Sequence, residues 1–161
     1  MKRRTKVGCI PVAAFVGLCV FSVWYTFRET YGLGVDSLWW LPPEAHNVTY
    51  YANGLTKLAE FDIEQKALER WCVPRKWPLR ELGAGEHPMM RRSWGMLENR
   101  GILPTIPEAS EAEREAGRRQ RVIKSFGAGD LFFEERWPNN GGYRVGYDVQ
   151  EKRGYYEFNH H

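Results

Sequence analysis

The longest apolar stretch of the chain lies at residues 7–27, and it contains no charged residue. A helix of this length spans about 30 Å, the thickness of the hydrocarbon core of a bilayer. A helix packed on a globular core normally keeps one polar face, and this stretch has none. The pattern therefore predicts a transmembrane helix at residues 7–27, with the lipid bilayer as its partner.

The flanks of this stretch predict its orientation. Residues 1–6 contain four basic side chains, and no comparable density of positive charge follows residue 27. Because positive flanks stay in the cytoplasm, we expect a cytoplasmic N-terminus and a C-terminal domain outside the membrane, the topology of an uncleaved signal anchor. A secreted protein released by signal cleavage is the alternative, although bulky residues such as Phe21 and Trp24 make a poor cleavage site. A lipoprotein signal is disfavoured because Leu18 precedes Cys19, where a small residue is needed.

Beyond residue 45, alternating apolar positions predict strands. Residues 47–51 and 56–63 form a predicted hairpin around the turn pair Asn53-Gly54. Asp62 and Gln65 have the spacing of a capping box, so a helix is expected to begin at Asp62. Apolar residues at helical spacing then give this helix one buried face.

The C-terminal part reads as a meander, because aromatic and β-branched residues alternate with polar ones and glycine-rich turns separate the runs. The expected strands there are 131–136, 143–148 and 155–158, with a short strand at 122–123. A second helix is expected within residues 89–99, and a charged surface helix at 108–121. The predicted fold class is α+β: an N-terminal single transmembrane helix followed by a small ectodomain with an antiparallel sheet of about five strands and one or two helices.

Four segments follow from this pattern: a basic cytoplasmic tail (1–6), a transmembrane signal anchor (7–27), a juxtamembrane stalk (28–45) and an α+β ectodomain (46–161). Glycines and prolines within residues 32–43 predict that the stalk is irregular. Trp39 and Trp40 leave two alternatives open: they insert into the membrane interface, or they pack against the domain.

Net charge changes the choice of partners. The chain carries a formal charge of +3, but residues 1–6 hold four of its 23 basic residues, which leaves 19 basic against 20 acidic residues in the remainder. The positive excess is therefore a signal of topology, and no nucleic acid partner is expected. Arg118, Arg119, Arg121 and Lys124 suggest an anionic site, with a solvated charged face as the simpler interpretation.

Cysteine and histidine spacing offers no metal or disulfide framework. Cys9 and Cys19 lie in the apolar segment, so Cys72 has no partner for an internal disulfide in the ectodomain. We expect Cys72 to be a buried small side chain rather than a reactive thiol. None of the four histidines has the spacing of a ligand pair, so no metal and no cofactor is expected.

Catalytic residues cannot be assigned from motifs. Nucleophile signatures are absent, and Glu134 and Glu135 are adjacent on a strand, so they point to opposite faces. An enzyme would have to use scattered carboxylates such as Asp62, Glu134 or Asp148. An aromatic patch around Trp39, Trp40 or Trp94 would instead favour a binding domain.

Several segments together resemble a group of small, uncharacterised, membrane-anchored or exported bacterial proteins. These segments are AEFDI, ALERW, DLFFEERWPNNGGYRVGYD and RGYYEF. The resemblance implies an N-terminal hairpin and helix followed by a C-terminal meander. It implies no activity and transfers no catalytic residue.

The sequence thus predicts a single-pass membrane protein, and its molecular function is expected to be that of a non-enzymatic anchored domain that binds or assembles with a protein of the cell envelope. The alternatives are an envelope enzyme that uses carboxylates and a secreted protein.

Overall fold

The computed structural model describes residues 9–103 and 122–160, and within the first helix it describes side chains at residues 14–24. The protein is α+β. Its helices are α1 (Cys9–Phe27), α2 (Gln65–Cys72) and α3 (Ser93–Asn99), with the 3-10 turn η1 (Val73–Arg75). Its strands are β1 (Thr30–Val35), β2 (His46–Ala52), β3 (Thr56–Asp62), β4 (Arg80–Glu81), β5 (Met89–Arg91), β6 (Ile123–Ser125), β7 (Leu131–Arg136), β8 (Gly142–Asp148) and β9 (Arg153–Asn159).

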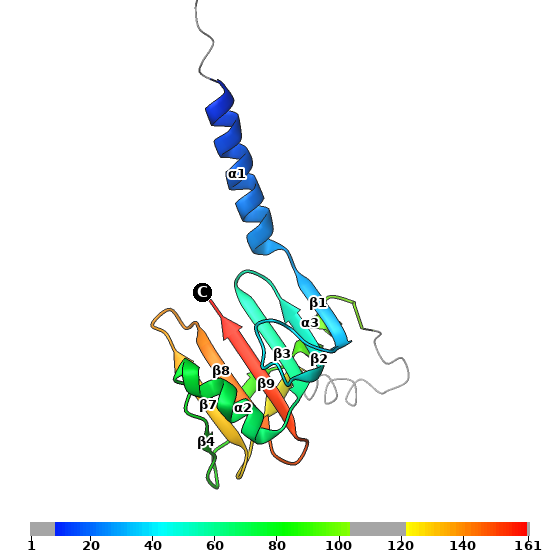
Figure 1. Cartoon of the computed structure of the whole chain (residues 1–161), viewed down its shortest axis with the longest axis vertical. Helices are drawn as coiled ribbons and strands as arrows, with labels where there is room; N and C mark the ends of the chain where they lie inside the picture. Colours follow the sequence, from blue (N-terminus) through cyan, green and yellow to red (C-terminus); the bar gives the residue numbers. More distant parts are fainter. Residues whose placement is uncertain (1–8, 104–121, 161) are drawn as a thin grey trace, which may run out of the picture.

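A seven-stranded antiparallel sheet organises the domain, in the order β1-β2-β3-β9-β8-β7-β4 (Figure 1). The predicted hairpin is confirmed as β2 and β3, and the predicted meander as β7, β8 and β9. The C-terminal strand β9 pairs with β3, so the two predicted halves form one continuous sheet. The sheet is larger than the five strands expected, because β1 and β4 add one strand at each edge.

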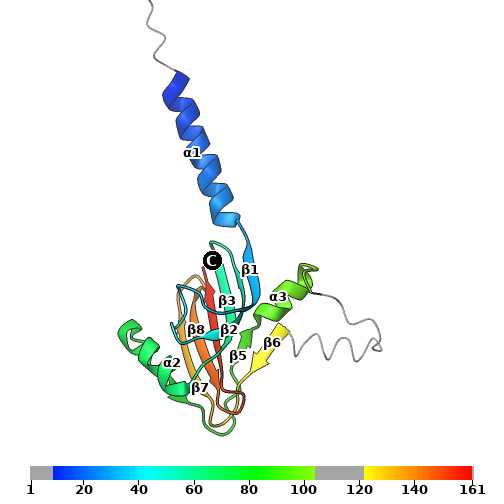
Figure 2. The ribbon, with the colours of Figure 1, turned by 45° about the vertical axis from the view of Figure 1, so that its right-hand side comes forward.

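Each face of the sheet is covered by a different layer, as Figure 2 shows with the sheet nearly edge-on. One face packs against α2 through a large apolar core that includes Phe61, Leu68, Trp71 and Val145. The other face lies under α3 and the two-stranded pair β5–β6, which together we call the cover layer. A smaller aromatic cluster around Phe126 and Tyr155 lies beneath this layer.

Helix α2 has the predicted buried face but not the predicted start. Ala67, Leu68, Trp71 and Cys72 are buried, as their helical spacing requires. Asp62 instead ends β3, and Glu64 is the N-cap without a side-chain hydrogen bond. The capping-box prediction was wrong because the carboxylate of Asp62 is held by Arg153 Nη1 at 2.8 Å and by Asn47 Nδ2 at 2.8 Å.

Residues 28–45 are not irregular throughout, as was predicted for the stalk. Thr30–Val35 form strand β1, which pairs with β2, and Leu41 and Ala45 are buried in the core. The β1 backbone approaches the ring of Tyr50 so closely that a Cβ at Gly32 would lie 2.6 Å from it. Gly32 therefore allows the strand to pack closely, whereas Gly34, with a φ of +60°, lies where the β1–β2 register shifts.

The two tryptophans of this segment take different positions. Trp40 packs against the core, with its ring centroid 5.5 Å from that of Tyr156. Trp39 is 89% exposed. Packing against the domain is thus confirmed for Trp40, whereas Trp39 is exposed and its insertion into a membrane interface stays a prediction.

The segment expected to be one helix at residues 89–99 is divided. Met89–Arg91 form β5, which pairs with β6, and only Ser93–Asn99 are helical. Gly95 lets α3 lie against Val122, because a Cβ there would meet the Val122 backbone at 2.5 Å. The charged helix expected at 108–121, like the tail at 1–6, lies outside the described residues.

Helix α1 projects away from the domain (Figure 1). All its described side chains, from Ala14 to Trp24, are exposed, and none of them is charged. Judged on the described residues alone, no helix of the structure is both long enough and apolar enough to cross a membrane. The side chains of residues 7–13 and 25–27, which belong to the predicted span, lie outside that description.

Candidate functional site

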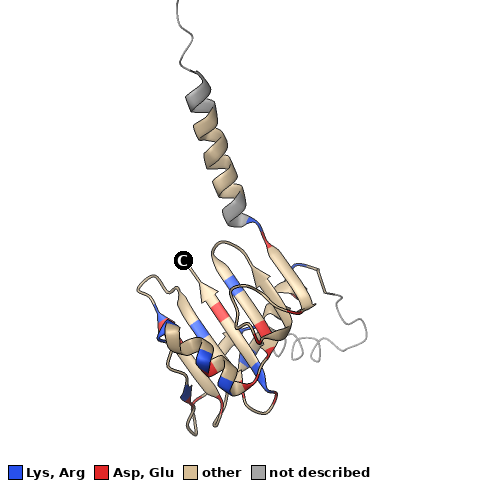
Figure 3. Ribbon diagram, in the orientation of Figure 1, with Lys and Arg blue, Asp and Glu red and all other residues tan. Residues whose placement is uncertain are grey.

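The most concentrated chemistry of the domain is a layer of charged side chains between the sheet and the cover layer. Antiparallel register places Glu60, Glu157, Arg144, Glu134 and Asp148 on the covered face of β3, β9, β8 and β7. The charged positions on the central strands are visible in Figure 3. We call this set, together with Arg91, Arg92 and Lys124 of the cover layer, the ionic layer.

Glu60 is the most deeply buried carboxylate of the ionic layer, with 1% of its surface exposed. Arg92 donates to its Oε2 from Nη2 at 2.6 Å and from Nε at 3.1 Å. The hydroxyl of Ser93 donates to Oε1 at 3.0 Å, and the Trp94 amide donates there at 3.4 Å. Burial alone would lower the pKa of the Arg92 guanidinium, but its hydrogen bond and attraction to Glu60 raise that pKa above its ordinary value.

Glu157 is bound from two sides. Arg91 donates from Nε to its Oε1 at 2.8 Å and from the backbone amide to its Oε2 at 3.2 Å. Arg144 reaches Glu157 at 3.4 Å and Glu134 at 2.7 Å, so it links two carboxylates. Burial would raise the pKa of Glu134, but hydrogen bonds from Arg136 and Arg144 lower it below its ordinary value.

The third pairing of the ionic layer joins β6 to the turn after β8. Lys124 donates to Asp148 Oδ2 and lies 3.3 Å from Glu151. The backbone amides of Gln150 and Glu151 donate to Asp148 Oδ1 at 2.9 and 2.8 Å. Burial would raise the pKa of Asp148, but the Lys124 hydrogen bond and these amides lower it. Lys124 thus binds within the protein rather than at the anionic site considered from the sequence.

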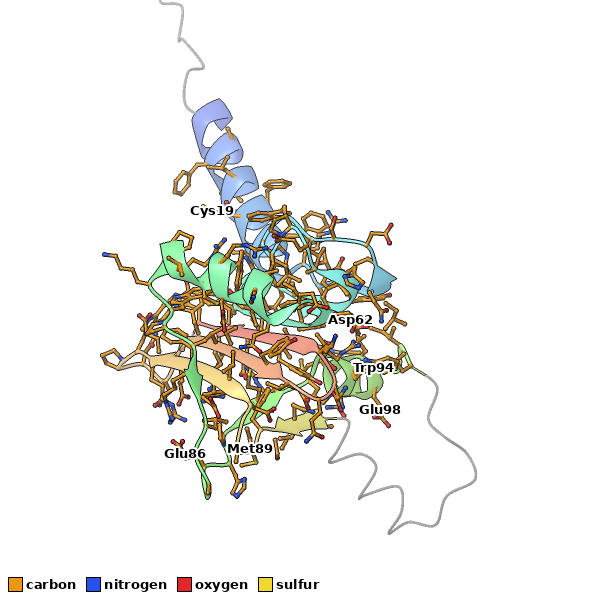
Figure 4. The ribbon with its side chains drawn as sticks, turned by 60° about the horizontal axis from the view of Figure 1, so that its bottom comes forward. Cys19, Asp62, Glu86, Met89, Trp94 and Glu98 are labelled. Atoms are coloured by element: carbon orange, nitrogen blue, oxygen red, sulfur yellow. The ribbon has the colours of Figure 1, made fainter. Side chains whose placement is uncertain are left out.

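The three carboxylates singled out from the sequence lie at different positions of the sheet. Asp62 and Asp148 lie in one row of the sheet on either side of Arg153, which is the register partner of both, while Glu134 is the register partner of Arg144, four residues before Asp148 on β8. Asp62 ends β3 and lies apart from Glu86 and Met89 (Figure 4). Exposed Glu86 forms a separate bidentate pair with Arg80, whose hydrogen bonds lower the pKa of Glu86 to about 2.

The sequence reasoning missed Glu60 and Glu157. Their signal was a single carboxylate within an otherwise aromatic or aliphatic strand, in LAEF and YYEF. Such a residue is normally placed on a wet face. In this protein the sheet face that carries Glu60 and Glu157 is itself covered by the cover layer. Each of these buried carboxylates therefore needs a cation from that layer.

A second feature lies where α1 meets the domain. Arg28, Thr30, Trp39, Trp40, Ala52, Asn53, Gly54 and Lys57 line a cavity of about 480 Å³, which we call the proximal cavity. Lys57 Nζ lies 5.4 Å from the Trp39 ring centroid and 5.6 Å from that of Trp40. The cavity therefore combines positive charge with aromatic surface.

A third feature is an open cavity of about 520 Å³ beside the C-terminal end of α2, lined by Glu69, Cys72, Val73, Lys76, Trp77, Pro78 and Leu79. Cys72 is buried, as expected, and burial raises the pKa of its thiol to about 12. A thiol with this pKa is a poor nucleophile at neutral pH. Within the described residues, no group of three or more histidine, cysteine or acidic side chains could hold a metal ion.

No known protein family, curated protein or solved structure matches this chain. Function must therefore be inferred from the residues and their geometry.

Proposed function

We propose that the protein is a single-pass membrane protein in which residues 7–27 anchor a non-enzymatic binding or assembly domain at the cell envelope. The observation that carries the proposal is the environment of α1. Its large apolar side chains, among them Phe15, Leu18 and Phe21, are exposed on a helix that leaves the domain. An isolated helix without a polar face needs an apolar environment, and a bilayer supplies one.

The basic tail at residues 1–6 supports an orientation with the N-terminus in the cytoplasm and the domain outside. The partner of the domain would then be another protein of the envelope. The open cavity beside Cys72 supports a binding role, because apolar side chains such as Trp77 and Leu79 supply most of its lining.

The ionic layer supports the non-enzymatic part of the proposal. Glu60, Glu157 and Asp148 each accept hydrogen bonds from a cation of the cover layer and from backbone or side-chain donors. A general acid or base must reach a substrate proton, and these carboxylates are occupied beneath a covering layer. Their arrangement serves to attach the cover layer to the sheet.

Charged substitutions in α1 test the anchor. Leu18→Arg combined with Phe21→Arg places two positive charges in the middle of the apolar segment, where each costs roughly 3 kcal/mol on insertion scales. We expect this variant to leave the membrane fraction of expressing cells. Leu18→Ala combined with Phe21→Ala is the matched control, and it should stay in that fraction.

Equal membrane retention of the arginine variant and the alanine control would contradict the anchor. If the arginine variant accumulates as folded, soluble protein in the cytoplasm, the domain is stable without the membrane, and the apolar segment is what attaches it. Folding of the released domain is checked by the cooperativity of its thermal unfolding.

A further inference from the structure

The proximal cavity lies at the end of the sheet that α1 approaches. Arg28 directly follows the helix, and Asn53 and Gly54 form the turn between β2 and β3, which points towards the end of α1 in Figure 1. If α1 is embedded, this cavity is the part of the domain nearest to the lipid headgroups.

The charges of the cavity have one sign. Arg28 and Lys57 are its charged lining residues, and no carboxylate lines it. Within the described part of the chain, neither cation has an ion pair with a carboxylate. The neighbouring carboxylate of Glu29 is bound by Arg100 and by the Tyr51 hydroxyl, so it does not neutralise Arg28.

The aromatic surface of the cavity is suited to a membrane interface. Trp39 is almost fully exposed, although it is a large apolar side chain. The guanidinium of Arg28 lies 5.5 Å from the Trp24 ring centroid on α1, which joins the cavity to the helix. Tryptophan with lysine and arginine is the combination that proteins use at the level of lipid headgroups.

We propose that the proximal cavity binds the phosphate headgroup of an anionic phospholipid from the bilayer that holds α1. Arg28 and Lys57 bind the phosphate, and Trp39 inserts beside it at the interface. This inference rests on the proposed membrane anchor. Its consequence is a fixed orientation of the domain, because a second contact with the membrane restricts rotation about the end of α1.

The test uses the full chain in lipid nanodiscs that contain a headgroup-spin-labelled quencher lipid. The discs are made of phosphatidylcholine alone or of phosphatidylcholine mixed with phosphatidylglycerol. The fluorescence of Trp39 is obtained as the difference between wild-type protein and the Trp39→Phe variant. We expect Trp39 to be quenched strongly in the anionic discs and weakly in the neutral ones.

Charge variants assign the effect to the cavity. Replacing one cation near an anionic surface lowers the equilibrium constant for docking on that surface about fivefold. Lys57→Gln and Arg28→Gln should each lower the ratio of docked to undocked Trp39 by about that factor, with a larger loss for the double variant. Lys66→Gln is the matched control, because Lys66 is an exposed lysine on α2, and it should leave the quenching unchanged.

The outcomes separate the two proposals. Protein that enters the discs but shows equal Trp39 quenching in neutral and anionic lipid overturns the headgroup site and leaves the anchor intact. Protein that does not enter the discs overturns both. If inorganic phosphate added to the anionic discs abolishes the quenching of Trp39, the cavity binds phosphate. If neither Lys57→Gln nor Arg28→Gln changes the quenching of Trp39, the headgroup site is refuted.

Discussion

Replacing Arg92 with methionine should destabilise the domain more than any other single change to its ion pairs. Glu60 is 1% exposed, and Arg92 is its positively charged partner, donating to Oε2 at 2.6 and 3.1 Å. Arg92→Met leaves a buried carboxylate with two neutral donors, Ser93 and the Trp94 amide. Removing one partner of a buried pair costs about 3–5 kcal/mol.

The predicted loss is large enough to measure directly. For a domain of this size, each kcal/mol corresponds to roughly 4 °C, so the midpoint of thermal unfolding should fall by roughly 10–20 °C. The assay is circular dichroism of the full chain in detergent, followed in the far and near ultraviolet. Arg70→Met is the control, since Arg70 pairs with Glu44 at 3.2 Å on the surface, and an exposed pair contributes at most about 1 kcal/mol.

A double variant distinguishes the loss of charge pairing from the loss of packing. Glu60→Gln together with Arg92→Met removes both charges of this buried pair, so the double variant should be more stable than the sum of the two single changes predicts, by about 1–3 kcal/mol. A fall of less than about 4 °C for Arg92→Met would refute the reasoning. A gain of stability in Glu60→Gln would also count against it, because replacing a catalytic carboxylate commonly stabilises an enzyme.

Three further changes have defined outcomes. The pKa of Asp148 is lowered in the folded state. The ionised Asp148 therefore stabilises the fold above the unfolded pKa of about 3.9, and this stabilisation is lost as the pH falls below that value. Asp148→Asn should reduce the dependence of the unfolding midpoint on pH between about pH 5 and pH 2. Cys72 is tested in a chain that carries Cys9→Ser and Cys19→Ser. In the folded protein it should resist alkylation at pH 8, because at a pKa of about 12 its thiolate is then about four orders of magnitude rarer than the thiol. In denaturant it should react fully. Gly146→Ala should lower the free energy of unfolding, measured with urea, by about 1–3 kcal/mol, because the added Cβ would lie 2.3 Å from the ring of Phe126. A variant as stable as the wild type would show that this ring moves freely.

Local patterns predicted the elements whose signals lie within a few residues. The β2–β3 hairpin followed from Asn53-Gly54, and Asn53 Oδ1 indeed accepts the amides of Leu55 and Thr56 at 2.9 and 2.7 Å. The buried face of α2 followed from its periodicity in the same way. Each of these signals is complete within one element.

Elements whose stability depends on distant partners were missed. The strand β1 looks broken in sequence, yet it pairs with β2 about twenty residues away, and its glycine makes room for Tyr50. Glu60 is paired with a cation 32 residues further along the chain, and Glu157 with one 66 residues before it. A sequence shows the charge of such residues, but only the fold shows which layer covers them.

The most direct test of the membrane anchor is alkaline carbonate extraction of membranes from cells that express the full chain, followed by an intact-mass measurement. The anchor proposal predicts that the protein stays in the pellet with the mass of the uncleaved chain. Release into the soluble fraction, or a mass that lacks the residues up to about position 27, would contradict it.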